Sequence, residues 1–121
     1  MEIEGLGEAG ALEVVFPQAR IGARSGGKSR ARYGTMFIRR GLGPSQAWYS
    51  WWDEARRARK LSARRVTVTV LDQHGTSQPR WTMRGAKPLA YSLSNLNALG
   101  HETLIETLEL SVTGFEGSAT A

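Results

Sequence analysis

The sequence predicts a mainly β domain, an antiparallel β-sandwich or barrel with one flanking α-helix at about residues 45–60. Three observations favour this class. Several short segments alternate apolar and polar residues with the period of two that is typical of strands. Turn residues separate these segments, and a single stretch has apolar residues at helical spacing. The length of 121 residues is that of one domain, so residues 1–121 are expected to fold together.

The first part of the chain holds two strand-like segments separated by a basic stretch. Residues 12–16 form a short β-type run that Pro17 ends. Residues 18–32 contain three Gly and five bases without an apolar period, which predicts an extended, mobile basic loop or a hairpin tip. Residues 33–40 form the next strand. One face of this strand holds Gly34, Met36, Ile38 and Arg40, and the other holds Thr35, Phe37 and Arg39.

The predicted helix begins at Pro44 and Ser45, residue types that suit a helix N-terminus, and it runs to about Lys60. Its apolar stripe comprises Ala47, Trp48, Trp51, Trp52, Ala55 and Ala58. We expect the three Trp side chains in the core or in a subunit contact rather than in a platform for stacked bases. The bases at the end of the helix are Arg56, Arg57, Arg59 and Lys60. They complement the helix dipole, and contact with a partner is the alternative reason for them.

The second half of the chain reads as β structure. Val66, Val68 and Val70 alternate with polar residues before a turn at residues 72–75. Residues 80–91 form a strand that Gly85 and Pro88 interrupt, which predicts a bulge or an edge position. In the strand at 104–113, one face holds Leu104, Glu106, Leu108, Leu110 and Val112, and the other face is mostly polar. Residues 117–121 are expected to form a short flexible tail.

The charge of the chain is unevenly distributed along the sequence. The formal net charge is +5, but residues 1–19 carry −4, residues 20–65 carry +11 and residues 66–121 carry −2. Such a basic middle segment indicates either nucleic acid or acidic protein surfaces as partners. The chain has no cysteine, which excludes disulfides, thiolate zinc sites and cysteine nucleophiles. No apolar run reaches the ~18–20 residues that span a bilayer, and the acidic start is unlike a secretory signal.

The patterns that could carry chemistry are weak. Residues 22–29 match the phosphate-binding pattern G-x-x-x-x-G-K-[ST], but no helical stripe follows Lys28 as that motif requires. His74 and His101 lie in a predicted turn and a predicted loop, and with Glu102 and Glu106 they make a poor metal site. No G-x-S-x-G elbow is present. We therefore expect no catalytic residue, no metal, no cofactor and no enzyme activity.

The order of several motifs makes the sequence similar to a known family. They are YGTMFIRRG, AWYSWWDEARR, RRVTVTVLDQHG, WTMRGAKPLAY and SNLNALGHETLIETLELSVTGFE. Each motif is weak alone, but in this order and spacing they closely resemble the T4-type tail-tube family of contractile phage tails and contractile injection systems. The resemblance covers about residues 3–116. Family members usually have a further strand ahead of a segment like residues 2–6. Either this start has been lost here, or the chain is a short version of the family pattern that leaves a sheet edge open.

The resemblance implies a structural role and a set of partners. Members of the family form two packed sheets with a flanking helix and assemble as hexameric rings that stack into a hollow tube. A contractile sheath surrounds the tube, which delivers cargo protein or DNA through its lumen. The expected partners are further copies of the chain, a sheath protein, baseplate and tape-measure proteins and the cargo. The particle would assemble in the bacterial cytoplasm, and the monomer is not expected to insert stably into a membrane.

The resemblance also assigns roles to residues. The loop that reaches a neighbouring subunit or ring would carry Arg20, Arg24, Lys28, Arg30 and Arg32. From the charge asymmetry of the chain, we expect the acidic residues that receive this loop on the next copy to be Glu2, Glu4, Glu8 or Glu13. The face toward the lumen would hold Thr35, Phe37, Arg39, Thr107, Glu109, Ser111 and Thr113. Two other functions stay open: a baseplate-proximal initiator or adaptor paralogue of the tube protein, and a basic nucleic-acid-binding module.

Overall fold

The structure, a computed structural model, describes residues 1–8, 10–11, 13–22, 31–57, 63–70, 78–95 and 104–120. One helix, α1 (Ala47–Arg57), and ten strands lie within these ranges. The strands are β1 (Glu2–Ile3), β2 (Gly7–Glu8), β3 (Glu13–Val15), β4 (Ala19–Ile21), β5 (Ala31–Tyr33), β6 (Thr35–Gly41), β7 (Arg64–Thr69), β8 (Gln78–Leu93), β9 (Ile105–Ser111) and β10 (Gly114–Thr120).

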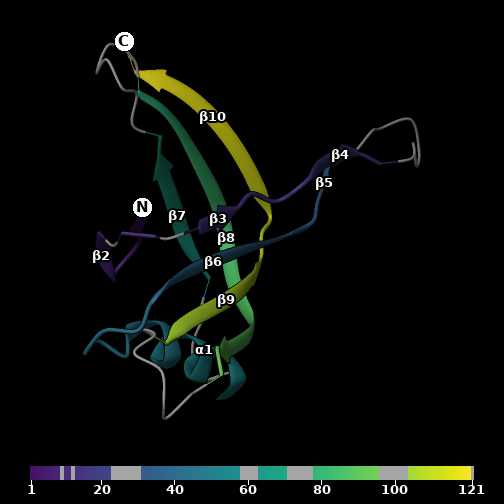
Figure 1. The fold of residues 1–121 in the computed structure, drawn as a ribbon. Coiled ribbons are helices and arrows are strands. Elements are labelled where there is room, and N and C mark those ends of the chain that lie inside the picture. The colour runs from purple at the N-terminus through teal and green to yellow at the C-terminus, as the bar shows by residue number, and fades with distance from the viewer. Residues whose placement is uncertain are drawn as a thin grey trace.

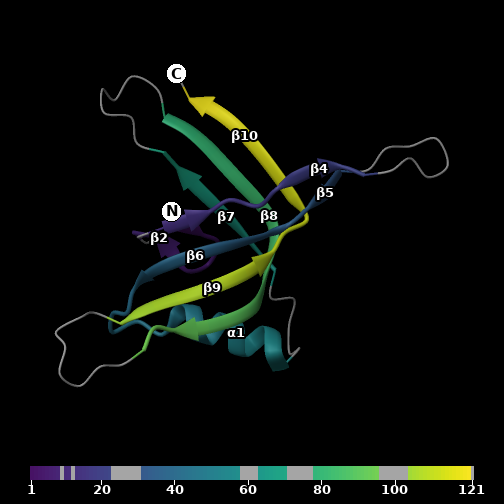
Figure 2. The ribbon, with the colours of Figure 1, turned by 45° about the vertical axis from the view of Figure 1, so that its right-hand side comes forward.

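The long strand β8 joins two parts of one antiparallel sheet (Figure 1). Its first half pairs with β7 on one side and β10 on the other, and β1 and β2 continue beyond β7. Its second half pairs with β9, beyond which lie β6 and β3. We call the first group the β7 sheet and the second group the β6 sheet. Figure 2 shows how β8 bends as it passes from one sheet to the other.

Backbone irregularities mark the bend in β8. Gly85 has a φ of 62°, a conformation that glycine adopts without strain. The register of β8 shifts against β7 between Arg64 and Val66, and it shifts against β9 between Pro88 and Ala90. Such bulges bend a strand and increase its twist. The predicted bulge is therefore present. The first half of β8 lies in the middle of the sheet, whereas the second half, which contains Pro88, pairs with β9 alone among the described strands.

The hydrophobic core lies between the two sheets. The buried apolar side chains of the β6 sheet include Met36, Ile38, Leu108 and Leu110. The buried side chains of the β7 sheet include Ile3, Val66, Val68 and Met83. In β6, β7 and β9 the buried residues alternate with less buried ones, as the period of a half-buried strand requires. The predicted apolar faces of residues 33–40 and 104–113 thus face the core.

Helix α1 closes one end of this core. Trp48 and Trp51 are each 1% exposed, and Trp52 is partly buried against the core. The helix starts where the sequence predicts a cap, since the backbone N–H of Ala47 donates to Ser45 Oγ at 3.3 Å. Its described part ends at Arg57, so the rest of the predicted range to residue 60 lies outside the described residues. With 11 residues, α1 is too short to cross a bilayer, and no other helix lies in the described ranges.

The predicted fold class is confirmed, because the described chain is mostly antiparallel β with one helix. The prediction of a tail after residue 116 is corrected. Residues 117–120 belong to β10, which pairs with β8 from Gly114↔Arg84 to Thr120↔Gln78. This strand is rich in small and polar residues, so it has no apolar alternation that a sequence pattern could detect. Its stability comes from backbone pairing with a long neighbouring strand.

Candidate assembly surfaces

The outer face of the β6 sheet brings together most of the residues that the sequence places toward a lumen. Register pairs in antiparallel strands share a face. The pairs across β6 and β9 are Thr35↔Ser111, Phe37↔Glu109 and Arg39↔Thr107. Six of the seven predicted residues therefore form three neighbouring rows on one sheet face, opposite the buried face. The face is mixed in polarity and includes an ion pair at 2.6 Å between Arg39 and Glu13 of β3.

Thr113 does not belong to these rows. β9 ends at Ser111, and Thr113 lies in the bend that leads to β10. Its backbone N–H and its hydroxyl both donate to the carbonyl oxygen of Arg84, at 2.9 and 3.2 Å. These bonds tie it to the bend of β8, beside Gly85. The strand predicted at 104–113 is therefore two residues too long at its end. Thr113 continues the alternation of apolar and polar residues, although the pairing of β9 ends at Ser111.

Both outer strands of the β6 sheet have an open edge among the described strands. β3 pairs with β6 alone, and the second half of β8 pairs with β9 alone. Each edge leaves a row of backbone N–H and C=O groups for another strand. The edge of β8 also carries exposed apolar side chains, with Leu89 at 52% and Leu93 at 49% exposure. The sheet therefore has two edges on opposite sides that can accept strands.

A buried polar network links the β6 sheet to α1. Arg40 of β6 forms an ion pair with Glu106 of β9, whose side chain is fully buried, and Tyr91 donates its hydroxyl to Glu106 Oε2 at 2.6 Å. The guanidinium of Arg40 lies 4.2 Å from the ring centroid of Trp48. Burial, followed by the hydrogen bond to Glu106, raises the pKa of Tyr91 to about 12. Glu106, a weak metal candidate in the sequence, is an internal partner of Arg40 and Tyr91.

The basic stretch forms a two-stranded hairpin with two different faces. β4 and β5 pair in the register Ala19↔Tyr33, Arg20↔Arg32 and Ile21↔Ala31. The hairpin protrudes from the body of the molecule (Figures 1 and 2). Arg20 and Arg32 lie directly opposite each other and both are exposed, while Ile21 is 83% exposed. Arg24, Lys28 and Arg30 lie outside the described residues.

The four acidic candidates differ in their interaction partners within the same chain. Glu13 is paired with Arg39, and Glu4 Oε1 accepts the backbone N–H of Arg65 at 3.4 Å. Glu2 is exposed, and no ion pair or side-chain hydrogen bond within the described residues involves it. Glu8 is the register partner of Glu2 in the β1–β2 ribbon. Glu2 and Glu8 thus occupy directly opposite positions of this ribbon.

The bases at the end of α1 have internal partners. Arg56 donates to Asp53 Oδ1, and Arg57 lies 3.2 Å from Asp53 Oδ2. The hydrogen bond from Arg56 is the main cause that lowers the pKa of Asp53. This supports the interpretation that these bases serve the helix itself. Arg59 and Lys60 lie outside the described residues.

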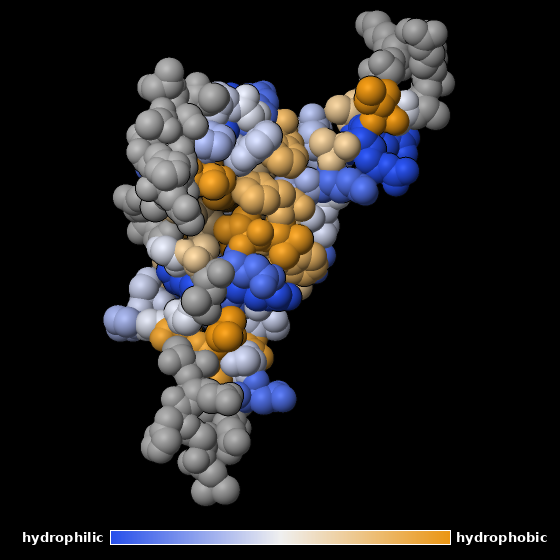
Figure 3. All heavy atoms as spheres, turned by 45° about the horizontal axis from the view of Figure 1, so that its top comes forward, coloured by the Kyte–Doolittle hydropathy of each residue, from blue (hydrophilic) through white to orange (hydrophobic). Residues whose placement is uncertain are grey.

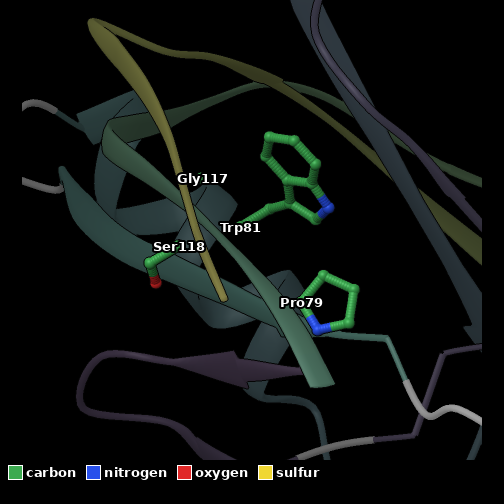
Figure 4. A pocket seen from close by; sticks show the side chains of 4 residues that line it. All are labelled: Pro79, Trp81, Gly117 and Ser118. Carbon is green, nitrogen blue, oxygen red and sulfur yellow. The ribbon is translucent and has the colours of Figure 1, made fainter. Parts of the chain in front are cut away.

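An aromatic surface covers the end of the core away from α1. Phe16 stacks on Phe115 at a centroid distance of 6.1 Å and meets Trp81 edge-on at 6.3 Å. Trp81 is 36% exposed and lines a hollow of about 380 Å³ with Pro79, Gly117 and Ser118 (Figure 4). Figure 3 shows hydrophobic surface gathered at the middle of one face of the molecule, with hydrophilic surface around it. The sequence indicated a sheet position for Trp81 but gave no sign of its partner Phe16.

The phosphate-binding pattern does not have the required structural context. The segment after residue 30 is strand β5, where the motif needs a helix. Residues 23–30 themselves lie outside the described residues, as do His74, His101 and Glu102. Within the described ranges, no cluster of three or more His, Asp or Glu side chains is arranged to hold a metal ion.

The described strands thus form an antiparallel sheet folded around one core, with a face of mixed polarity between two edges that no other described strand pairs with. The model of the T4-like virus tail tube protein gp19 family matches residues 18–116. The chain belongs to this family, and the resemblance seen in the sequence is confirmed. Family membership makes it a structural component of the tail-tube type, part of a phage tail or injection-system particle. A comparison with curated protein sequences finds no significant match.

Solved structures of the same fold include chains of a prophage baseplate, of an extracellular contractile injection system and of an Hcp protein. A chain of the anti-feeding prophage baseplate is similar with a TM-score of 0.73 and 18% identity, covering 91% of this chain and 81% of that one. A chain of the PVC sheath–tube complex in the extended state gives a TM-score of 0.59 at 14% identity, covering 92% and 78%. Hcp1 from Flavobacterium johnsoniae gives 0.60 at 15% identity, covering 91% and 88%. At these identities the likeness establishes the shared fold.

Proposed function

We propose that the chain is the subunit of a hollow tail tube, in which six copies form a ring and the rings stack inside a contractile sheath. The observation that carries this proposal is the β6 sheet, which has one face in the core, one face of mixed polarity and, among the described strands, an open edge at each side. If β3 of one copy pairs with the second half of β8 of the next, the contact is head-to-tail. A repeated head-to-tail contact closes into a ring when its rotation permits.

The outer face of the β6 sheet would line the lumen of this ring. Its rows contain Thr35, Phe37, Arg39, Thr107, Glu109 and Ser111. This face combines hydroxyls, one aromatic ring and charges of both signs. Such a face stays hydrated and does not bind one cargo tightly, so it suits the wall of a water-filled channel. Thr113 is left out of this proposed surface because it lies in the bend before β10.

The other expected partners follow from the same role. A sheath would surround the tube, a baseplate and a tape-measure protein would set its start and its length, and cargo protein or DNA would pass through the lumen. The tube would act mechanically and carry out no chemistry, and it would assemble in the bacterial cytoplasm. A tube initiator or adaptor at the baseplate would use the same surfaces, and the likeness to a chain of an anti-feeding prophage baseplate favours keeping this as a second candidate.

Electron microscopy of the purified chain tests the proposal. We expect six-fold rings or stacked tubes in negative stain, and particles of discrete ring mass in sedimentation. A chain that stays monomeric at all concentrations and shifts DNA in a salt-dependent way would instead be the basic nucleic-acid-binding module. Rings that never stack, together with binding to a longer tube of another protein, would identify the initiator or adaptor.

A further inference from the structure

A row of apolar side chains crosses the outer face of the β6 sheet. The strands β3, β6, β9 and the second half of β8 lie side by side (Figure 2), and residues at directly opposite positions share a face. The middle row of the outer face consists of Val15, Phe37, Glu109 and Ala90. Val15 is 42% exposed, Ala90 is exposed and Phe37 is partly exposed. Three of the four side chains in this row therefore offer apolar surface outside the core.

Polar rows flank this apolar row on both sides. The row on one side consists of Thr35, Ser111 and Lys87. The row on the other side consists of Glu13, Arg39, Thr107 and Ser92. In the second of these rows, the ion pair between Arg39 and Glu13 balances the two charges. The apolar side chains of the outer face are thus confined to one level, between two levels that bind water.

Glu109 is the charged residue of the apolar row. It occupies the position directly opposite Phe37 on one side and Ala90 on the other. Within the described residues, its carboxylate forms no ion pair and accepts no hydrogen bond. A carboxylate next to an aromatic ring suits a Lys or Arg side chain of another molecule. The cationic group meets the carboxylate, and the aliphatic stem packs against the ring.

We propose that Val15, Phe37 and Ala90 form an apolar belt in the lumen that contacts polypeptide cargo, and that Glu109 receives the basic side chains of this cargo. This contact rests on the proposed tube function, and it makes protein the class of cargo. Each copy of the chain contributes one such row to the wall, so the rows of successive copies follow one another around the lumen.

Duplex DNA fits this face less well than a polypeptide does. The affinity of DNA for proteins comes largely from phosphates that Lys and Arg neutralise. The charged residues in the described rows are Lys87, Arg39, Glu13 and Glu109, so these rows carry no net charge. The bases of a duplex are stacked inside it, and the apolar row gains little contact with them. A polypeptide that exposes apolar and basic side chains gains both kinds of contact.

Each single contact is weak, as transport through a channel requires. One aromatic ring, one Val and one Ala per copy cover little of a passing chain, and the polar rows beside them stay hydrated. An extended polypeptide meets the same row again in each copy of a ring and in each stacked ring. Weak contacts then add up along the cargo through multivalency. Cargo is thus retained in the lumen and still free to advance.

Retention of three probes in wild-type tubes tests the class of cargo. The probes are a labelled flexible peptide of Leu, Lys and Ser, the same peptide with Glu in place of Lys, and a short labelled DNA duplex. Tubes are assembled with each probe, and protease or nuclease then removes the probe that lies outside the lumen. After sedimentation of the tubes, we expect more protected basic peptide than acidic peptide, and the least protection for the duplex.

Two variants test the two contacts separately. Phe37→Ser should lower the protected amount of basic peptide about tenfold, because the largest apolar side chain of the row is lost. Glu109→Gln, which keeps the shape of the side chain, should abolish the preference for the basic over the acidic peptide. The matched controls are Tyr49→Ser on α1 and Glu116→Gln on β10, two exposed positions outside the row, and both should retain the peptides as the wild type does.

The outcomes separate this contact from the proposed tube function. Wild-type tubes that protect the duplex as well as or better than the basic peptide overturn the contact, identify DNA as the better cargo and leave the tube function standing. Phe37→Ser tubes that retain as much peptide as the wild type overturn the contact as well. A wild-type chain that forms no rings or tubes overturns both. The probe comparison uses the wild type alone, so a folding defect of a variant cannot imitate its result.

Discussion

At the residue scale, the two ion pairs of β6 sit in opposite environments. Arg39 and Glu13 are about half exposed, whereas Glu106 is fully buried and Arg40 is 17% exposed. The two arginines are neighbours in the sequence, but the alternation of a strand turns them to opposite faces. Exposed pairs contribute little to stability because water screens them, whereas breaking a buried pair leaves an uncompensated charge. The two positions should therefore respond very differently to loss of the acid.

Replacement of Glu106 by Gln should destabilise the fold by about 3 kcal/mol, because Arg40 would stay buried without its counter-charge. The matched replacement Glu13→Gln should cost under about 1 kcal/mol. Urea unfolding followed by tryptophan fluorescence measures both, since Trp48 lies directly against Arg40. An equal loss of stability in the two variants would contradict a larger contribution of the buried ion pair to folding.

Stability should fall at high pH because of Tyr91. Its pKa is raised from 10.0 to about 12 in the folded chain. Below pH 10 the phenol is protonated in both the folded and the unfolded chain, so its contribution to the free energy of unfolding is complete. As the pH rises from 10 through 12, the unfolded chain loses the proton first, so unfolding becomes more favourable. The absorbance of tyrosinate, compared between wild type and Tyr91→Phe, should show one phenol titrating near pH 12, and a midpoint near pH 10 would contradict this.

At the element scale, strand β8 determines the architecture by bending between two sheets. Gly85 adopts a positive φ at this bend, and a Cβ at this position would meet Thr113 Oγ1. Thr113 in turn donates two hydrogen bonds to the carbonyl of Arg84, which fixes the path from β9 into β10. The bend is thus held by contacts from a segment close in space and almost 30 residues later in the chain.

Replacement of Gly85 by Ala should destabilise the chain by about 1–3 kcal/mol, through backbone strain and the clash with Thr113. The control Gly43→Ala introduces the same methyl group where nothing lies within 4 Å and should change stability little. Thermal unfolding of the two variants gives the comparison. A melting temperature that Gly85→Ala leaves unchanged would show that the bend tolerates a side chain.

At the scale of the whole molecule, the apolar surface is not fully covered by the chain itself. Leu89 and Leu93 are about half exposed on the open edge of β8, and Trp81 lines an exposed hollow at the far end of the core. Open edges next to exposed apolar side chains favour association with another strand. This is the arrangement expected of a subunit whose surfaces become complete in an assembly.

The replacement Leu89→Asp should therefore weaken ring formation and leave the monomer folded. Its charge would lie on the edge where a neighbouring β3 is proposed to pair, and a desolvated charge there is costly. Ser50→Asp, on the exposed side of α1, is the control with the same added charge. Analytical ultracentrifugation should show fewer rings for Leu89→Asp than for the wild type, whereas Ser50→Asp should form as many rings as the wild type. Intact rings at wild-type concentrations would argue against an interface along this edge.

Local patterns in the sequence predict a large part of this fold. The alternation of Met36 with Ile38 and of Leu108 with Leu110 predicts the buried faces of β6 and β9. The spacing of Trp48 and Trp51 predicts the buried side of α1. The short strands β1, β2 and β10 are not predicted, because two residues or a run of small polar residues carry no usable period. Pairing with a neighbour that lies far away in the sequence stabilises them.

The sequence by itself determined the fold class, the core faces of its main strands and membership in the tail-tube family, because these depend on local periodicity and on the order of motifs. The tertiary structure alone decided which charges meet. Arg40 and Glu106 are 66 residues apart, and both looked like polar exceptions on apolar faces until the sheet joined them. Likewise, the register of two ribbons placed Arg20 opposite Arg32 and Glu2 opposite Glu8. Electrostatic energy depends on distance in space, and only the folded sheet fixes that distance.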